Sequence, residues 1–312
     1  MHCLRLPAQS LTRIQRSYST APIHAELDRW IAGKKELNLS ATLHPDHLSD
    51  LYVTLPTRDG TRQPYEPPVE GAPLPYGHHL AFFHPRTPEK YLRPDGTDAD
   101  FCPPEPFVRR MWAGGRIEWK KPLLIGGKAT SSTTVRSVEK KGFERGSPMV
   151  FVKQENDMRN EGDSEPAVLE ERTHVYLGLG VNKVQRSARV VDALPSPHFS
   201  FTYTPSATTL FRFSALTFNG HHIHLDREYA QRSEGYPERL VHGPLTALML
   251  LETLLFYEPD AKLATFEYRA LNPVLVNRMS TVHGAWETDT VAHLWTQDED
   301  GVVGMQGKVH IA

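Results

Sequence analysis

The sequence contains few cysteines, no large excess of positive or negative charge, and no long hydrophobic run. Each of these features excludes a class of proteins. Only Cys3 and Cys102 occur among 312 residues, which excludes a disulfide framework and a site with several thiolate ligands. The 35 lysines and arginines nearly balance the 37 aspartates and glutamates, so a general nucleic-acid-binding protein is not expected. The longest apolar run, Leu245–Tyr257, is interrupted by polar residues and is shorter than the roughly 20 residues of a membrane span. The composition is typical of a globular protein with two domains of roughly 100–150 residues.

Acidic residues are absent from the first 25 positions, where arginine and hydroxyl residues are frequent. This composition is typical of a mitochondrial transit peptide, whereas a secretory signal needs a continuous apolar stretch. Residues 16–19 read Arg-Ser-Tyr-Ser and resemble a site cut by the matrix processing peptidase. We expect residues 1–19 to be a transit peptide that directs the protein to the mitochondrial matrix. An ordinary N-terminal tail is the alternative.

Proline is concentrated in one part of the chain, since residues 56–106 hold twelve of the 25 prolines. Proline lacks a backbone donor and fixes φ, so neither the interior of a sheet nor a long helix can lie there. Aromatic residues are interleaved with the prolines. We therefore expect an ordered loop that wraps around a core.

Two series of β-branched and aromatic segments, separated by turn residues, predict strands. The first series comprises residues 116–119, 123–125, 129–138, 149–154 and 169–177, with a hairpin loop expected over 156–166. The second series comprises residues 263–269, 274–276, 279–286, 290–297 and 302–310. Pro122 and Pro273 lie 151 positions apart in similar surroundings. An internal duplication of an α+β unit is the simplest explanation, and chance similarity between strand-rich segments is the alternative.

A helix is expected over Leu245–Leu255, directly after His242, Gly243 and Pro244. Proline suits the first helical turn, where its missing N–H group would have no partner. The helix is apolar on nearly every face and must be enclosed, for example by a curled antiparallel sheet. The free N–H groups at its start carry a partial charge of about +0.5, which favours an anion or a developing oxyanion. Gly243 would let a ligand approach this backbone closely, although a plain core helix is the alternative.

Three histidines and an aspartate lie within six positions, about twenty residues before this helix: His221, His222, His224 and Asp226. As metal ligands they would suit zinc or iron, but their spacing matches no specific ligand motif, and we expect no metal. As acid–base groups they fit better, because an imidazole with a reference pKa near 6.5 exchanges protons at matrix pH. A purely structural cluster is the third interpretation.

The segments 217–226 and 241–245 resemble the hydratase motif of the MaoC-like (R)-specific enoyl-thioester hydratases. The resemblance is closer to the branch of mitochondrial 3-hydroxyacyl-thioester dehydratases type 2 and mesaconyl-CoA hydratases, because residues 109–119 resemble its N-terminal signature. It implies an α+β double hot-dog fold, with two antiparallel sheets each wrapped round a helix. A non-catalytic first half, residues 20–185, and a second half with the motif, residues 186–312, are then expected.

The resemblance also assigns roles to residues. His224 falls on the catalytic histidine, Gly243 on the glycine whose N–H polarises the thioester carbonyl, and Asp226 on the acidic residue two places after the histidine. Asn219 occupies the position of the motif's catalytic aspartate, and His221 that of its asparagine. An amide orients a water or hydroxyl but cannot take up a proton. Either His224 then performs most of the proton transfer, or His221 or Asp226 shares it.

The function implied by the resemblance is a dehydratase/hydratase that interconverts (3R)-hydroxyacyl and trans-2-enoyl thioesters of acyl carrier protein or CoA. Mitochondrial type II fatty acid synthesis is the expected setting, with no metal or cofactor required and the oligomeric state, such as a homodimer, left open. A second hypothesis is a hydratase of a short branched dicarboxylyl-CoA such as mesaconyl-CoA, for which Arg212 and Arg227 are candidate pocket residues. A third is a catalytically silent acyl-binding protein, motivated by Asn219.

Overall fold

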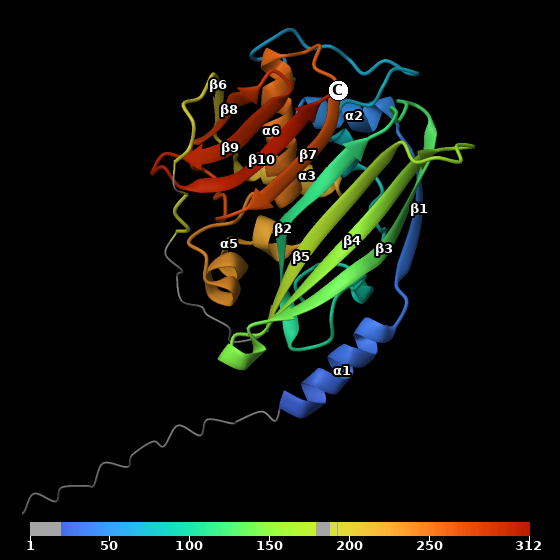
Figure 1. Ribbon diagram of the computed structural model, residues 1–312, viewed down its shortest axis with the longest axis vertical. Helices are drawn as coiled ribbons and strands as arrows, with labels where there is room; N and C mark the ends of the chain where they lie inside the picture. The colour runs from blue at the N-terminus through green and yellow to red at the C-terminus, as the bar shows by residue number, and fades with distance from the viewer. Residues whose placement is uncertain (1–19, 179–187, 192) are drawn as a thin grey trace, which may run out of the picture.

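The computed structural model describes residues 20–178, 188–191 and 193–312 (Figure 1). The expected transit peptide and the expected boundary at 185/186 lie outside these residues. Ten strands form one antiparallel sheet in the order β1-β3-β4-β5-β2-β7-β10-β9-β8-β6. Their bounds are β1 Glu36–Thr42, β2 Phe107–Trp119, β3 Lys128–Lys141, β4 Met149–Asn160, β5 Val168–Gly178, β6 Phe199–Tyr203, β7 Leu263–Ala270, β8 Ser280–Thr288, β9 Val291–Asp298 and β10 Val303–Ile311. The α-helices are α1 Thr20–Ala32, α2 Pro45–Tyr52, α3 Ala207–Leu216, α4 His222–Leu225, α5 Arg227–Tyr229 and α6 Gly243–Tyr257.

The strand order reads the same from either edge of the sheet. From the centre outwards, β2, β5, β4, β3 and β1 of the first half correspond to β7, β10, β9, β8 and β6 of the second. The two expected sheets are joined edge to edge, because β2 pairs with β7 and Ile117 lies opposite Phe266. Arg116 also forms an ion pair with Glu267 across this junction. The α+β class and the repeated unit expected from the sequence are therefore confirmed.

Several strand bounds differ from the expectation. Strand β4 continues to Asn160, so the loop expected over 156–166 is wrong in its first part. The stretch looked like a loop because it is polar, but Asn156 is buried and its side chain accepts a hydrogen bond from Thr133. The segments 123–125 and 274–276 contain only one isolated bridge each, in equivalent places of the two halves. Strands β1 and β6 were not expected.

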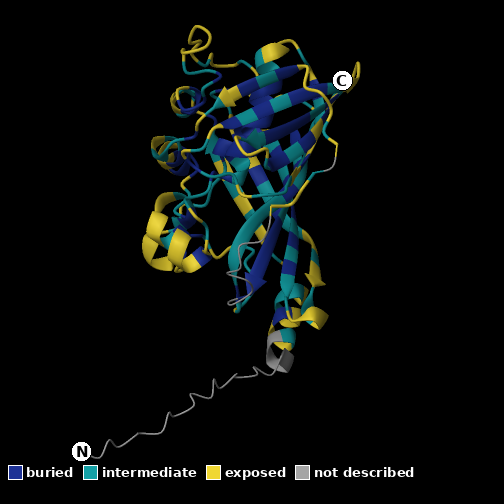
Figure 2. Ribbon diagram, turned by 90° about the vertical axis from the view of Figure 1, so that its left-hand side faces the viewer, coloured by how far each residue is buried: buried dark blue, intermediate teal, exposed yellow. Residues whose placement is uncertain are grey.

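Helix α6 is the enclosed helix predicted from the sequence. Every residue from Leu245 to Leu254 is buried, and the helix lies against the strands of the second half (Figure 1). One of these buried residues is charged: Glu252 accepts hydrogen bonds from Thr57, Arg58 and His78. These three donors tie α6 to the loop that covers it. In Figure 2 the buried residues follow the strands and this helix, whereas exposed residues gather on turns and outlying segments.

The proline-rich segment, residues 56–106, has no strand or α-helix, and contains two short 3₁₀ helices at His78–Ala81 and Glu89–Tyr91. The first of these is completely buried, so the expectation of an ordered loop around a core is confirmed. The helix of the first half differs from α6 in position: α1 packs Leu27 against Phe107, Val150, Val152 and Tyr176 at one end of the sheet. In the described part of the chain, no helix combines the length and hydropathy needed to cross a membrane.

Candidate active site

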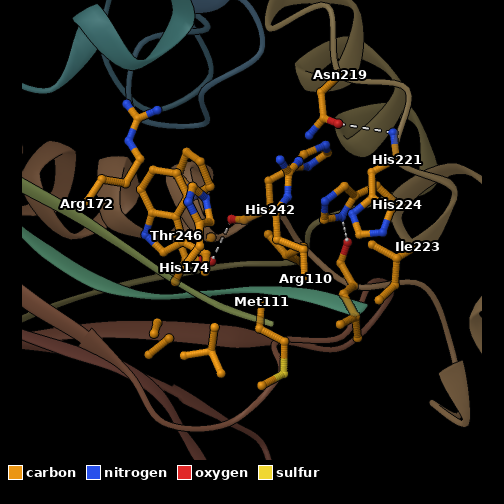
Figure 3. Close-up of a pocket in the computed structure, with 18 of the residues that line it drawn as sticks. Arg110, Met111, Arg172, His174, Asn219, His221, Ile223, His224, His242 and Thr246 are labelled. Atoms are coloured by element: carbon orange, nitrogen blue, oxygen red, sulfur yellow. Dashed lines mark hydrogen bonds between the residues drawn. The ribbon is translucent and has the colours of Figure 1, made fainter. Parts of the chain in front are cut away.

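A cavity of about 780 Å³ lies beside the start of α6, between the two halves of the molecule (Figure 3). Side chains from the inner face of the first-half strands line one part of it: Arg110, Trp112, Ser131, Thr133, Gln154, Asn156, Arg172 and His174. The segment before α6 and the first turn of α6 line another part. Helix α1 covers this face only near Val150 and Tyr176, and farther along the same face Gln154 and Asn156 line the cavity. A volume of this size suits a small-molecule ligand.

The segment 217–226, which we call the hydratase-like motif, contains the sharp turn after α3 and the short helix α4. Helix α3 begins with a capping box in which Ser206 accepts a hydrogen bond from the N–H of Thr209. After α3 ends, Phe218 adopts a positive φ of 49°, which reverses the chain. The side-chain oxygen of Asn219 then accepts a hydrogen bond from the N–H of His221 at 3.0 Å. This turn fixes the positions of Asn219 and His221 at the wall of the cavity.

His224 is held as a neutral imidazole. Its Nδ1 atom donates a hydrogen bond to the carbonyl oxygen of Leu240 at 2.8 Å, which leaves Nε2 as the basic atom. The pKa of His224 is lowered to about 4, chiefly by burial; the hydrogen bond to Leu240 acts to raise it and the nearby Arg110 acts to lower it. The ring therefore carries no charge at neutral pH and is ready to accept a proton.

A second histidine, His242, supports this ring. The two rings are stacked with their centroids 3.7 Å apart (Figure 3). Ser214 bonds to His242 Nε2 at 2.9 Å, and His242 is the residue directly before α6. Burial lowers the pKa of His242 well below its usual value, with His224 and His221 acting in the same direction. His242 thus holds the His224 ring in place between the hydratase-like motif and α6. The sequence pattern assigned no role to His242, although it directly precedes Gly243.

Gly243 is the first residue of α6 and lines the cavity. Its N–H lies in the first helical turn, where no partner is available within the helix. A Cβ atom at this position would lie 2.7 Å from Cγ of Trp112, so only glycine fits here. Trp112 is itself fixed by the Arg172 guanidinium, 4.8 Å from its ring, and by the edge of His174. The arrangement can direct an N–H group at a developing oxyanion.

The structure brings together four of the five residues that the sequence suggested. Asn219, His221, His224 and Gly243 all line the cavity. Asp226 does not: it is exposed, and its carboxylate caps α5 by accepting hydrogen bonds from the N–H groups of Glu228 and Tyr229. A carboxylate used in this way faces solvent. Asp226 therefore caps a helix and does not lie with the other four residues at the cavity.

The two arginines considered from the sequence are also elsewhere. Arg212 is exposed and donates to the carbonyl oxygen of Val53, and Arg227 is exposed and paired with Glu238. Arg110 and Arg172 line the cavity instead. Arg172 comes from the strand predicted over 169–177, whereas Arg110 lies in the part of β2 that precedes the predicted segment 116–119. Whether a strand residue points inwards also depends on register. In particular, β2 has a bulge between Trp112 and Gly114 that changes its alternation.

Arg172 and its partners form a charged group beneath Trp112. Glu170 accepts two hydrogen bonds from the Arg172 guanidinium, both at 2.8 Å. Although burial acts to raise the pKa of Glu170, Arg172 and His79 lower it to about 2. His174 nearby is neutral, because burial and the charges of Arg110 and Arg172 lower its pKa.

The described residues contain no group of three or more His, Cys, Asp and Glu side chains that could hold a metal ion.

Known proteins are similar to this chain in sequence and in fold. A family model described as hydroxyacyl-thioester dehydratase type 2 matches residues 77–276. Mesaconyl-C(4)-CoA hydratase of Chloroflexus aurantiacus is 38% identical over 216 residues, which are 66% of this chain and 73% of that protein. The mitochondrial hydroxyacyl-thioester dehydratase type 2 of Schizosaccharomyces pombe is 28% identical over 229 residues, which are 65% of this chain and 74% of that protein.

Among solved structures, a MaoC-like dehydratase from Phytophthora capsici has a TM-score of 0.64 and 15% sequence identity. The match covers 92% of this chain and 97% of that one. At this identity the likeness concerns the fold alone. It confirms the double hot-dog architecture expected from the sequence.

Proposed function

Because the chain belongs to the hydroxyacyl-thioester dehydratase type 2 family, we propose that it is a hydro-lyase acting on 3-hydroxyacyl thioesters. In this proposal it interconverts (3R)-hydroxyacyl thioesters and trans-2-enoyl thioesters. The observation that carries it is the meeting of a neutral His224 and the first N–H group of α6 at one cavity. A base and an oxyanion donor are the two groups that removal of a proton next to a thioester requires.

Dehydration begins with the α-proton of the substrate. Nε2 of His224 accepts this proton, while Nδ1 stays bonded to the carbonyl oxygen of Leu240. Negative charge develops on the thioester oxygen, where the Gly243 N–H stabilises it. Loss of one such donor typically raises the barrier by about 3–4 kcal/mol.

The β-hydroxyl group leaves in the second part of the reaction. His224, now protonated, donates the same proton to the β-oxygen, the carbon–oxygen bond breaks, and water departs. His224 is neutral again, so the cycle closes without a second acid. The Asn219 amide, which cannot transfer a proton, donates a hydrogen bond that orients this oxygen. Hydration follows the same steps in reverse.

We also propose a mitochondrial setting. The S. pombe relative is described as mitochondrial, and the composition of residues 1–19 fits a transit peptide. Residues 20–185 and 186–312 would be the non-catalytic and catalytic halves of the mature protein. In the matrix, a thioester of acyl carrier protein or CoA in type II fatty acid synthesis is the natural substrate class.

A second candidate function rests on the cavity's charge. Arg110 lines the cavity close to His224. Burial acts against the charged form of Arg110, and the nearby Asp95 favours it. A guanidinium at this place suits a second carboxylate on the acyl group. The Chloroflexus relative is described as acting on mesaconyl-C(4)-CoA. A short dicarboxylyl-CoA is therefore the alternative substrate class for the same chemistry.

A substrate panel on the purified protein tests both candidates. Straight-chain trans-2-enoyl thioesters of CoA and of acyl carrier protein are compared with mesaconyl-CoA, and hydration is followed by the loss of enoyl-thioester absorbance. Turnover of the straight chains supports the fatty-acid assignment, and exclusive use of mesaconyl-CoA overturns it in favour of the second. Binding without turnover of any thioester would contradict the enzymatic proposal and support an acyl-binding protein.

A further inference from the structure

A carboxylate from a distant part of the chain lies behind the hydratase-like motif. Asp95, in the proline-rich segment, is buried, and its Oδ2 atom lies 4.0 Å from Nε2 of His221. Among the described residues, neither of these two buried atoms has a hydrogen-bond partner. Buried polar atoms without hydrogen bonds carry a free-energy penalty, which a hydrogen bond between Asp95 and His221 would remove.

The surroundings of Asp95 hold its carboxylate in one orientation. Its Oδ1 atom accepts hydrogen bonds from the N–H of Thr97 at 3.0 Å and from the Thr97 hydroxyl at 2.7 Å. The Nη1 atom of Arg93 forms an ion pair with Oδ2 at 3.6 Å. Since Oδ1 is occupied by the turn, Oδ2 is the atom left for His221.

The backbone fixes the proline-rich segment against the motif at the same place. The carbonyl oxygen of Asp95 accepts a hydrogen bond from the N–H of His222 at 2.9 Å. Gly96 has a φ of +80°, and a Cβ atom there would lie 2.2 Å from the carbonyl oxygen of Gly220. Gly96 and Gly220 therefore allow the proline-rich segment and the hydratase-like motif to approach each other backbone to backbone. This contact sets the position of Asp95 relative to His221.

We propose that Asp95 is a positioning residue that selects the tautomer of His221, an inference that rests on the proposed function. Nε2–H of His221 donates to Asp95, so Nδ1 is left with a lone pair toward the cavity. This lone pair accepts the hydroxyl hydrogen of the substrate, or of the attacking water. A carboxylate that orients a histidine in this way is a recurrent device, and such bonds are often long until substrate binds.

The electrostatic surroundings agree with a neutral His221. The groups that face it are His222 and His224 of the motif, Arg93 and Asp95 of the proline-rich segment, and Arg110 of β2. Burial, with the nearby histidines and arginines, lowers the pKa of His221 well below its usual value. Proton transfer thus stays with His224. The β-hydroxyl group donates a hydrogen bond to His221 and accepts one from the amide nitrogen of Asn219. The side-chain oxygen of Asn219 already accepts a hydrogen bond from the backbone N–H of His221.

The substitution Asp95→Asn tests this role with little change of shape. The retained Oδ1 atom can still accept both bonds from Thr97, so the turn is kept. The new amide nitrogen donates to Nε2 of His221 and thereby forces the proton onto Nδ1. We expect kcat to fall about 30-fold, equivalent to about 2 kcal/mol at 1.36 kcal/mol per factor of ten, with KM within about 3-fold.

The chain provides a matched control in a second Asp-Gly-Thr turn. Asp59 accepts hydrogen bonds from the N–H of Thr61 at 2.9 Å and from its hydroxyl at 2.6 Å, as Asp95 does from Thr97. Asp59 differs in that His221 lies beside Asp95 and not beside Asp59. Asp59→Asn removes the same charge from the same kind of turn and should leave kcat and KM at their wild-type values.

A second readout does not depend on activity. Ring ¹⁵N chemical shifts of the histidines, with His221 assigned by its loss in His221→Gln, report which nitrogen carries the proton. We expect Nε2–H in the wild type and Nδ1–H in Asp95→Asn. The same tautomer in both proteins, or a kcat for Asp95→Asn equal to that of Asp59→Asn, overturns the inference. If the wild type turns over no thioester, the proposed function fails. The ¹⁵N shifts still show whether Asp95 selects the tautomer of His221.

Discussion

The pH dependence of the reaction gives a direct measure of the state of His224. The reaction requires the neutral ring, whose pKa is lowered to about 4 by burial. At pH 5.5 such a ring is about 97% neutral, whereas a ring with the ordinary pKa of about 6.5 would be only about 9% neutral. We therefore expect kcat/KM for hydration to change little between pH 7.5 and 5.5. Only below about pH 4 should it fall by about tenfold per pH unit.

The assay needs a separate check that the protein stays folded in acid. A lowered histidine pKa means that the folded state resists protonation, so His224 favours unfolding once the pH falls below its unfolded value of about 6.5. Glu170 acts at lower pH: its stabilising contribution is complete above about pH 4.5 and is lost as the pH falls toward its folded pKa of about 2. Circular dichroism at each pH identifies the range in which rates are meaningful. Within it, an acid limb centred near pH 6.5 would refute the assignment of His224 as a buried, neutral base.

A variant sharpens the same experiment. Arg110 is a secondary cause of the lowered pKa of His224, after burial. Arg110→Gln removes this cation, so the acid limb should move to higher pH by less than about one pH unit. A limb that moved to lower pH would contradict the sign of the electrostatic argument.

Three further outcomes are expected. Glu252→Gln removes the carboxylate charge that faces the buried donors of Thr57, Arg58 and His78. It should reduce the free energy of unfolding, measured in urea, by about 3–5 kcal/mol. Glu258→Gln at the exposed end of α6 should have little effect. Gly243→Ala places a Cβ atom 2.7 Å from a fixed tryptophan and should lower kcat by roughly 10–100-fold, while Gly33→Ala, with no contact closer than 3.5 Å, should not. Asp226→Ala removes only a helix cap, so it should cost about 1 kcal/mol of stability in thermal unfolding and keep kcat within about 3-fold.

The elements that could be predicted from the sequence are those whose signal is local. Helix α6 follows from a proline in its first turn and a continuous apolar run, and the central strands follow from their β-branched residues. Strand β1 has no such signal, because it is a short edge strand with a half-buried, polar-rich sequence. Its place is decided by pairing with β3, a partner almost a hundred residues later.

The candidate site likewise combines residues that local sequence motifs indicate with residues that only the tertiary structure brings together. Asn219, His221, His224 and Gly243 were found because they lie in two short motifs near one helix start. Asp95 was missed, since its meeting with His221 depends on the path of a long loop that no local pattern encodes. Two supports for the site, the stacking of His242 on His224 and the packing of Trp112 on Gly243, likewise depend on tertiary structure.

The most direct test of the central claim is the hydration rate of crotonyl-CoA by the wild type and by His224→Gln. Glutamine retains polar bulk beside His242 and an N–H group for the carbonyl oxygen of Leu240, but it cannot accept the proton. We expect turnover by the wild type and a loss of kcat of about 10²–10⁴-fold in the variant, with an unchanged circular dichroism spectrum. Undiminished activity in His224→Gln would contradict it.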